Sequence, residues 1–253
     1  MSYAACIVAA APVRAEASHR SEMVSQLLFG EFASVLETTK DFTRVVTLYD
    51  NYEGWCQSSQ LTTVTEADTL LPVAGYTAGR DCVAIINNTA VALSAATPVY
   101  EPGVTYQLGQ YAIIYAPGYL PVQPFEETVI KQLALPYLNV PYLWGGRSHF
   151  GLDCSGFTQQ VLKVMGIQLM RDASQQATQG VVVDFLQEVK CGDLAYFDNE
   201  EGRITHVGIM LNNEEIIHAS GRVRIDKIDN QGIINSDTGV RTHKLRVIKR
   251  MSV

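Results

Sequence analysis

One of the five cysteines lies where a nucleophile would be activated. Cys154 follows a glycine-rich loop in GLDCSGF (151 to 157) and stands at the predicted first turn of an amphipathic helix. At a helix N-terminus, unpaired backbone N–H groups and the helix dipole stabilise negative charge, which favours thiolate over thiol. We therefore predict that Cys154 is a nucleophile. A lone cysteine is more often a small buried hydrophobe, and we interpret the remaining ones as structural: Cys6, Cys56, Cys82 and Cys191.

Two histidines are spaced so that one could act as a base and the other could orient it. His206 opens HVGIML (206 to 211), His218 lies near the end of EIIHA (215 to 219), and Asn212 is halfway between them. A three-residue turn centred on Asn212 would place the two histidines directly opposite each other on one face of a hairpin, with Cβ atoms about 5 Å apart. A slip of one residue would put them on opposite faces, so two unrelated strand histidines remain the alternative.

The other candidate ligands show no telling spacing. A zinc site would have to combine Cys154, His206, His218 and Cys191, but no pair of them has the short spacing of C-x-x-C or H-x-x-x-H. We therefore expect no metal and no other cofactor. The remaining histidines, His19, His149 and His243, have no acidic or cysteine neighbour at a useful distance along the chain, and we interpret them as incidental.

The elements that must position these residues differ between the two halves of the chain. The first 120 or so residues contain short β-segments punctuated by Gly, Asn, Asp and Pro, which favours one or two small barrels. We expect an SH3-like barrel over 1–62, a second small β-module and linker over 63–120, and the catalytic domain over 121–253. The predicted strands are VSQLLF (24 to 29), RVVTLY (44 to 49), GWCQSSQL (54 to 61), CVAIINNTAVAL (82 to 93) and YAIIYA (111 to 116).

The second half predicts helices followed by an antiparallel sheet. Helices are expected over 125–135, from Cys154 onward and, more briefly, from the N-cap Asp172; Gly166 ends the second one. That helix has one apolar face, made by Phe157, Val161, Leu162 and Met165. Strands follow at 193–197, 206–211, 215–219 and 244–250. Helices first and an antiparallel meander second make an α+β domain.

Composition excludes several classes of protein. The 253 residues are 47% hydrophobic and 18% charged, which indicates globular cores, and the net charge of −7 argues against binding to nucleic acid. The sequence has no apolar run of about 18 residues, so we expect no membrane span. The first 18 residues contain the small residues of a signal peptide, but no Lys or Arg precedes their apolar run. We expect a cytoplasmic protein; a periplasmic or secreted one is the alternative.

Four blocks in the second half resemble a known family. PYLWGG (141 to 146), DCSGF (153 to 157), THVGIML (205 to 211) and IIHASG (216 to 221) are similar, in order and spacing, to the signature blocks of NlpC/p60-type bacterial cell-wall cysteine peptidases. The resemblance implies a pared-down papain-like fold over about residues 120–250. It implies Cys154 as nucleophile, His206 as base and His218 as the orienting residue, with Tyr142 beside the backbone N–H of Cys154 in the oxyanion hole.

The first half resembles bacterial SH3-like domains, in the arrangement of relatives that trim free murein peptides. The likeness rests on VSQLLFGE (24 to 31) and YDNYEGWC (49 to 56). It implies cleavage between γ-D-Glu and a diamino acid in stem peptides with a free N-terminal L-Ala. The implied substrate-binding residues are Asp172, Glu31 and Tyr52 for the ammonium, Arg171, Ser155 and Ser174 for the free carboxylate, and Asp153. Arg171 and Asp172 could also simply start a helix, and Ala173 departs from the family's hydroxyl residue.

Two other functions remain open. An exported peptidoglycan hydrolase or cell-wall binding protein would give the SH3-like modules the main role. An acyltransferase or amidase on the same fold would use the same cysteine and histidines with a different acceptor. The leading expectation is a cysteine endopeptidase whose only partner is a murein peptide, without nucleic acid or membrane, and whose barrels restrict the cleft to free N-termini.

Overall fold

The computed structural model describes residues 2–79 and 81–252 and divides the chain into two compact units. The first comprises residues 1–122 and 144–150, and the second comprises residues 123–143 and 151–253. Residues 144–150, which fall inside the expected catalytic domain 121–253, thus pack with the first unit. Within the described residues, no helix has the length and apolar character needed to cross a membrane.

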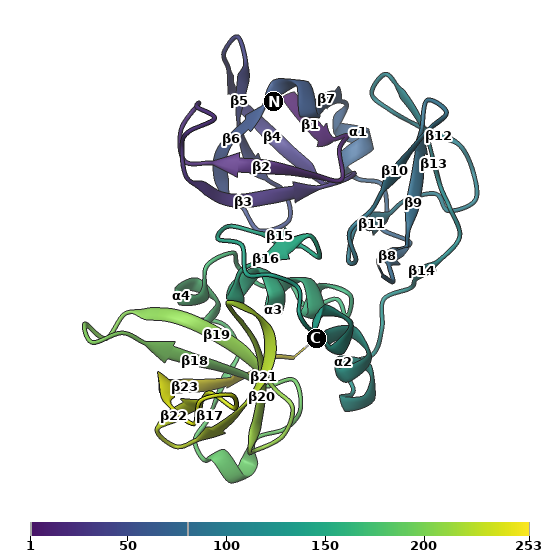
Figure 1. Cartoon of the computed structure of the whole chain (residues 1–253). Helices are drawn as coiled ribbons and strands as arrows, with labels where there is room; N and C mark the ends of the chain where they lie inside the picture. Colours follow the sequence, from purple (N-terminus) through teal and green to yellow (C-terminus); the bar gives the residue numbers. More distant parts are fainter. Residues whose placement is uncertain (1, 80, 253) are drawn as a thin grey trace. The chain divides into compact units, whose positions relative to one another are not determined.

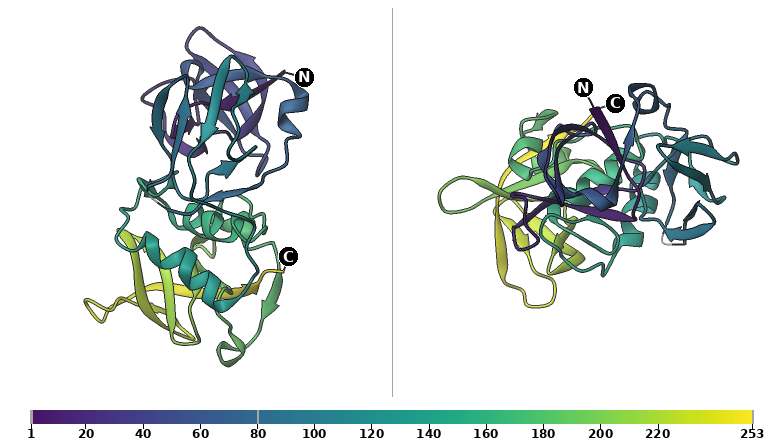
Figure 2. Two further views of the ribbon diagram at one scale, coloured as in Figure 1. Left: turned by 90° about the vertical axis from the view of Figure 1, so that its right-hand side faces the viewer. Right: turned by 90° about the horizontal axis from the view of Figure 1, so that it is seen from above.

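A seven-stranded antiparallel sheet with the order β3-β2-β6-β5-β4-β1-β7 begins the first unit. In Figure 2 its purple strands curl round a common interior. That interior is filled by small and branched side chains, including Ala11, Val13, Leu27 and Val45. The strands are β1 (Ser2–Cys6), β2 (Ala10–Arg14), β3 (Met23–Leu28), β4 (Phe32–Thr38), β5 (Phe42–Thr47), β6 (Glu53–Gln57) and β7 (Leu61–Val64).

Two smaller sheets complete the first unit, with the orders β10-β9-β13-β12 and β11-β8-β14 (Figure 1). They share a core with the first sheet, in which Phe29 meets Tyr115 edge-on at 6.2 Å between ring centres. The single strand expected over 82–93 is instead a hairpin, because Asn87 and Asn88 both adopt positive φ and turn the chain. The elements are α1 (Glu66–Thr69), β8 (Gly75–Thr77), β9 (Val83–Ile86), β10 (Thr89–Ala92), β11 (Pro98–Val99), β12 (Tyr106–Leu108), β13 (Tyr111–Tyr115), β14 (Tyr119–Leu120) and the later β15 (Arg147–Ser148).

The second unit is mostly sheet, and its helices are few. Its sheet has the order β17-β23-β18-β19-β20-β21-β22, and β22 also pairs with β23. Strands β18 to β23 therefore close into a six-stranded barrel, a closure that the predicted antiparallel meander did not include. The elements are α2 (Glu127–Ala134), β16 (Gly151–Leu152), α3 (Cys154–Lys163), α4 (Ala173–Gln176), β17 (Val181–Val183), β18 (Leu194–Asp198), β19 (Ile204–Met210), β20 (Glu215–Ser220), β21 (Arg222–Asp229), β22 (Gly232–Ile234) and β23 (Arg241–Arg250).

A glycine permits this closure. Gly232, the first residue of β22, has φ +136°, and a Cβ there would lie 1.8 Å from the carbonyl oxygen of His243 on β23. Only a residue without a side chain allows the two backbones to approach this closely. The strands β21 and β22, which pattern alone did not predict, thereby join the predicted strands into a barrel.

Helix α3 is the buried element that holds the predicted nucleophile. Every residue of α3 is buried, and the predicted apolar face of Phe157, Val161, Leu162 and Met165 is confirmed. Asp153 is the N-cap and accepts a hydrogen bond from the backbone N–H of Gly156 at 2.7 Å. The helix packs against β19 and β20, the two strands that carry the predicted histidines.

Candidate active site

Cys154 is the first residue of α3, as predicted, but its thiol is buried, with 6% of the residue exposed. Burial raises the pKa of Cys154 to about 12, and the nearby Asp153 carboxylate adds to this rise. Hydrogen bonds from the backbone of Val207 and Ser155 act in the opposite direction but are outweighed. The resting nucleophile is therefore a neutral thiol, which corrects the expectation that the helix N-terminus alone would favour a thiolate.

The two catalytic histidine candidates lie on one face of the β19–β20 hairpin, but not in the predicted register. His218 pairs with Gly208, so His206 lies diagonally rather than directly across from it. The register differs from the prediction by two residues, which preserves the face. The rings meet edge-on with their centres 5.0 Å apart, and Nε2 of His206 lies 2.7 Å from Nδ1 of His218. One ring thus orients the other.

His206 is a neutral base in the resting site. Burial lowers the pKa of its imidazole well below the ordinary value, and the neighbouring His218 and His243 lower it further. Since Nε2 is engaged with His218, Nδ1 is the nitrogen left to receive a proton from the thiol. Helix α3 packs on β19, and the Cys154 thiol bonds to the backbone of Val207, the residue that follows His206. The arrangement is a cysteine at the start of a helix that packs on the two strands of a bonded histidine pair.

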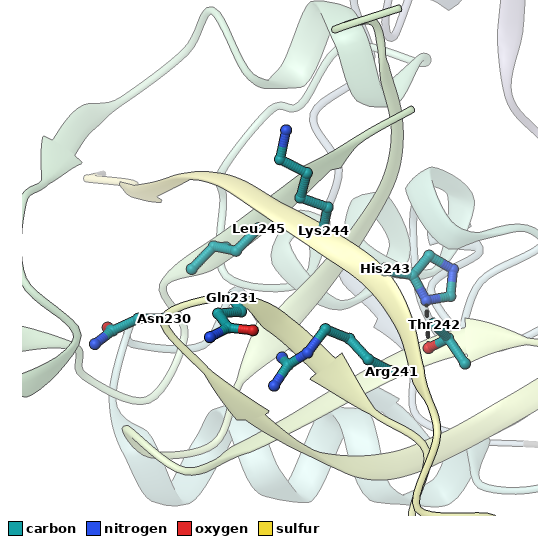
Figure 3. A pocket seen from close by; sticks show the side chains of 7 residues that line it. All are labelled: Asn230, Gln231, Arg241, Thr242, His243, Lys244 and Leu245. Atoms are coloured by element: carbon teal, nitrogen blue, oxygen red, sulfur yellow. Dashed lines mark hydrogen bonds between the residues drawn. The ribbon is translucent and has the colours of Figure 1, made fainter. Parts of the chain in front are cut away.

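His243 is a member of this cluster that sequence reasoning missed. Its ring stacks on His206 with 4.1 Å between ring centres and an interplanar angle of 26°. Figure 3 shows His243 among the side chains that line a hollow of about 620 Å³, with its Nδ1 2.8 Å from the Thr242 hydroxyl. Burial, with a further contribution from His218, lowers the pKa of His243 to about 4, so it too is neutral near pH 7.

Arg171 is buried beneath the start of α3 instead of lying open as a carboxylate fork. Its guanidinium holds Asp153 in a bidentate ion pair, with distances of 3.1 and 2.6 Å, and donates to the Ser155 hydroxyl at 2.9 Å. The residue is 1% exposed. This network fixes the loop and the first turn that carry Cys154.

Three further predicted residues also lie in the second unit. Burial raises the pKa of the Tyr142 phenol, and its proximity to Cys154 and Asp153 raises it further. Asp172 is the N-cap of α4 and half-buried, as predicted for a cap, and its N–H donates to the Gln175 side chain at 3.1 Å. Ser174 is exposed in the first turn of α4.

The two predicted barrel residues, Glu31 and Tyr52, belong to the first unit. Glu31 is 4% exposed and accepts hydrogen bonds from Arg147 on both carboxylate oxygens, at 2.9 and 3.1 Å. Arg147 in turn is fully buried and lies over the ring of Tyr49. The Glu31 carboxylate is thus neutralised within its own unit, where we had expected it to face an ammonium. Tyr52 is half-buried, and its N–H donates to the Thr47 hydroxyl at 2.9 Å.

The metal alternative has no geometric support in the part of the chain that is described. Over residues 2–79 and 81–252, no three His, Cys, Asp or Glu side chains gather as metal ligands. Nε2 of His206 and Nδ1 of His218 bond to each other. The Cys191 thiol lies 3.9 Å from the carbonyl oxygen of Glu127.

Comparison with known proteins defines the class of these two units. Residues 139–242 match the NlpC/P60 family, and residues 13–61 match the bacterial dipeptidyl-peptidase SH3 domain. The chain therefore carries an NlpC/P60 peptidase domain with a papain-like fold and a bacterial SH3-like domain, as the sequence motifs predicted. A crystal structure of an NlpC/P60 family protein from Bacillus cereus has the same fold, with a TM-score of 0.81 at 20% identity, covering 98% of this chain and 99% of that one.

Two relatives carry more specific names. A gamma-D-glutamyl-L-lysine dipeptidyl-peptidase of Bacillus subtilis is 45% identical over 92 residues, which are 36% of this chain and 31% of that protein. Dipeptidyl-peptidase 6 of Lysinibacillus sphaericus is 26% identical over 251 residues, covering 86% of this chain and 88% of that protein. With the Bacillus subtilis relative, the match spans about a third of that protein's length.

Proposed function

We propose that this protein is a cysteine endopeptidase that cleaves the bond between γ-D-Glu and the diamino acid in free murein stem peptides with an unblocked N-terminal L-Ala. The observation that carries the proposal is the placement of Cys154 at the start of α3, which packs on the strands of the bonded His206–His218 pair. The name of the Bacillus subtilis relative, a gamma-D-glutamyl-L-lysine dipeptidyl-peptidase, supports the substrate class. Recycling of such peptides places the enzyme in the cytoplasm.

The reaction starts from a neutral thiol and a neutral imidazole. As Sγ of Cys154 attacks the carbonyl carbon of the γ-glutamyl bond, Nδ1 of His206 takes the thiol proton. The backbone N–H of Cys154 and the hydroxyl of Tyr142 receive the oxyanion. The C–N bond then breaks as His206 protonates the leaving amine, and a thioester remains on Cys154. Water, deprotonated by His206, then attacks the thioester carbon; the C–S bond breaks, the proton returns from His206 to Sγ of Cys154, and the dipeptide is released.

We assign the recognition of the substrate's ends to polar side chains near the start of α4. The half-buried carboxylate of Asp172 is proposed to receive the N-terminal ammonium of L-Ala, and the exposed hydroxyl of Ser174 the α-carboxylate of D-Glu. Ser155 and Arg171 support this subsite from beneath, through their hydrogen bonds to Asp153 and to each other. Glu31 has no part in this assignment, because its carboxylate is already held by Arg147.

Product analysis tests the proposal directly. The protein is incubated with L-Ala-γ-D-Glu-L-Lys, with the corresponding diaminopimelate peptide and with whole sacculi, and the products are identified by mass. We expect the dipeptide L-Ala-γ-D-Glu from the free peptides and little release from sacculi. Comparable release from sacculi would favour the exported hydrolase instead. Transfer of the acyl group to an added amine, without hydrolysis, would favour an acyltransferase.

Replacement of Gly208 by Ala should impair catalysis without unfolding the protein. A Cβ at residue 208 would lie 2.8 Å from Cβ of His218 and 2.7 Å from Cδ1 of Ile216. The His218 ring must then move from His206, and a displacement of about 1 Å at a catalytic group can lower the rate up to about 100-fold. We expect kcat to fall at least about tenfold with little change in KM. A matched Gly79→Ala variant, at a position with open space around the Cβ and no positive φ, should fold and retain full activity; equal rates in both variants would contradict the role of Gly208.

Replacement of His243 by Gln should move the acid limb of the pH profile of kcat/KM to higher pH. His206 must be neutral to accept a proton, and its pKa is lowered by burial, by His218 and by His243. Without His243, the His206 pKa rises, so the base becomes protonated, and activity is lost, at a higher pH. The acid limb of the kcat/KM profile, measured over about pH 3 to 8, should therefore shift to higher pH. His19→Gln, an exposed change in the first unit, serves as control. An acid limb that keeps its position or moves to lower pH in His243→Gln would contradict the effect of His243 on the pKa of His206.

A further inference from the structure

A buried carboxylate outside the cysteine–histidine–histidine set contacts its last member. Asp226 lies on β21, next to β20, and is 1% exposed. Its Oδ2 is 3.1 Å from Nε2 of His218. We propose that Asp226 is a positioning residue of the active site, which sets the tautomers of His218 and His206 so that Nδ1 of His206 presents a lone pair to Cys154. The catalytic consequence of this role rests on the proposed function, whereas the tautomers themselves do not.

The surroundings of Asp226 keep it ionised. Oδ1 accepts hydrogen bonds from the backbone N–H of Ser236 and from Nη2 of Arg224, both at 2.9 Å. Nε of Arg224 lies 2.9 Å from Oδ2, and Arg224 is itself held by Asp237 at 3.0 Å. Burial alone would raise the pKa of Asp226, but the hydrogen bonds from His218, Arg224 and Ser236 together lower it well below the ordinary value. At neutral pH the side chain is therefore a carboxylate.

An ionised carboxylate determines the protons on both rings. It can only accept hydrogen bonds, so Nε2 of His218 must carry a proton. A neutral His218 then has no proton on Nδ1, which accepts a hydrogen bond from the Nε2–H of His206 across 2.7 Å. A neutral His206 with its proton on Nε2 has a lone pair on Nδ1. That lone pair is the one required to take the thiol proton.

The strand register brings these groups together. His218 pairs directly with Arg224 on β21, and Asp226 lies two residues further along the same face of that strand. His206 is diagonal to His218 on the other side, on β19. Three adjacent strands of the barrel thus each contribute to one hydrogen-bonded row of side chains, which runs from the buried ion pair to the base.

An asparagine at residue 226 should reverse the tautomers. Its amide oxygen is held at the Oδ1 position, because two donors, the backbone N–H of Ser236 and Nη2 of Arg224, face that position and neither can accept, whereas only Nε of Arg224 is an obligatory donor at the Oδ2 position. The NH2 group then faces Nε2 of His218 and donates to it. The His218 proton moves to Nδ1, where it opposes Nε2–H of His206 and drives that proton to the nitrogen that must receive the thiol proton. A wrong tautomer of this kind is costly in histidine-dependent hydrolases.

The test combines ¹⁵N NMR of the histidine side chains with steady-state kinetics of the full chain. In the wild-type protein at pH 7 we expect His218, assigned by its loss in His218→Asn, to carry its proton on Nε2. In Asp226→Asn we expect the proton on Nδ1, with kcat on L-Ala-γ-D-Glu-L-Lys lower by about 30-fold and KM within about threefold. Asp229→Asn is the matched control, since Asp229 lies on the same strand and is also held by an arginine, at 2.6 and 2.7 Å.

Each result bears on the proposal. A wild-type His218 protonated on Nδ1 would overturn it, and this measurement needs no variant to fold. An Asp226→Asn protein with unchanged tautomers would also overturn it, whatever its kcat, as would reversed tautomers with wild-type kcat. If the wild-type protein fails to cleave any murein peptide, the proposed function is wrong. The NMR measurement of the His218 tautomer still tests whether Asp226 determines that tautomer.

Discussion

Replacement of Cys154 by Ala should abolish turnover while the protein remains folded. The sulfur of Cys154 forms the covalent thioester, and no other nucleophile is offered at the start of α3, where Ser155 is bonded to Asp153 and Arg171. Ala is well tolerated in a first helical turn, and the loss of one buried sulfur should cost roughly 1 kcal/mol. Product formation by mass spectrometry should be undetectable, and circular dichroism should match that of the wild type.

Cys191→Ala is the matched control for this prediction. Cys191 is half-buried and lies outside the histidine cluster, and its thiol makes a weak contact of 3.9 Å with the carbonyl oxygen of Glu127. Its replacement should leave kcat nearly unchanged. An essential Cys191 together with a dispensable Cys154 would show that the nucleophile has been assigned to the wrong residue.

Acetylation of the substrate's N-terminus should lower kcat/KM by about 100-fold or more. Under the proposed function, the carboxylate of Asp172 receives the ammonium of L-Ala. Acetylation removes that positive charge, so the carboxylate is desolvated in the complex without its compensating cation, at a cost of several kcal/mol. The measurement compares free and N-acetylated L-Ala-γ-D-Glu-L-Lys under identical conditions. Stem peptides in intact peptidoglycan have the same amine blocked, so the same reasoning predicts slow action on sacculi.

A variant at residue 172 assigns this effect to one side chain. Asp172→Asn should slow cleavage of the free peptide and bring its rate closer to that of the acetylated peptide. The neutral amide of Asn favours the substrate's ammonium over its acetylated N-terminus less strongly than a carboxylate does. The exposed Asp184→Asn serves as control and should retain the wild-type ratio. Near-equal rates for free and acetylated peptides in the wild-type protein would refute the ammonium subsite and move the wall-hydrolase alternative to first place.

Local sequence signals were sufficient wherever neighbouring residues determine the structure. The start of α3 at Cys154, its apolar side chains and the stop at Gly166 all lie within one short segment, and the structure has them as predicted. The shared face of His206 and His218 was also predictable, because side chains alternate along a strand and both residues lie on one hairpin. The exact register was not, since the turn proved to be centred on Asn213 and the pairing shifted by two residues.

Strands whose residues have a weak local preference for the extended conformation were also missed. Strands β1 and β2 are rich in Ala, which has low strand propensity, and their place in the sheet comes from pairing with β4, β7, β3 and β6. The run 82–93 was interpreted as one strand, although Asn87 and Asn88 in its middle carried the turn signal. Both errors arise because strand formation depends on partners that are distant along the chain.

Only the tertiary structure decided the environment of the reactive groups. His243 and Asp226 join His206 and His218 through strand pairing around a closed barrel, and Glu31 is neutralised by Arg147, 116 residues away along the chain. Burial, likewise a property of the packed domain, makes the Cys154 thiol neutral against the preference of its helix position. Residue type and spacing determined which side chains could react. The protonation states and partners of those side chains depend on desolvation and long-range contacts, which exist only once the chain is folded.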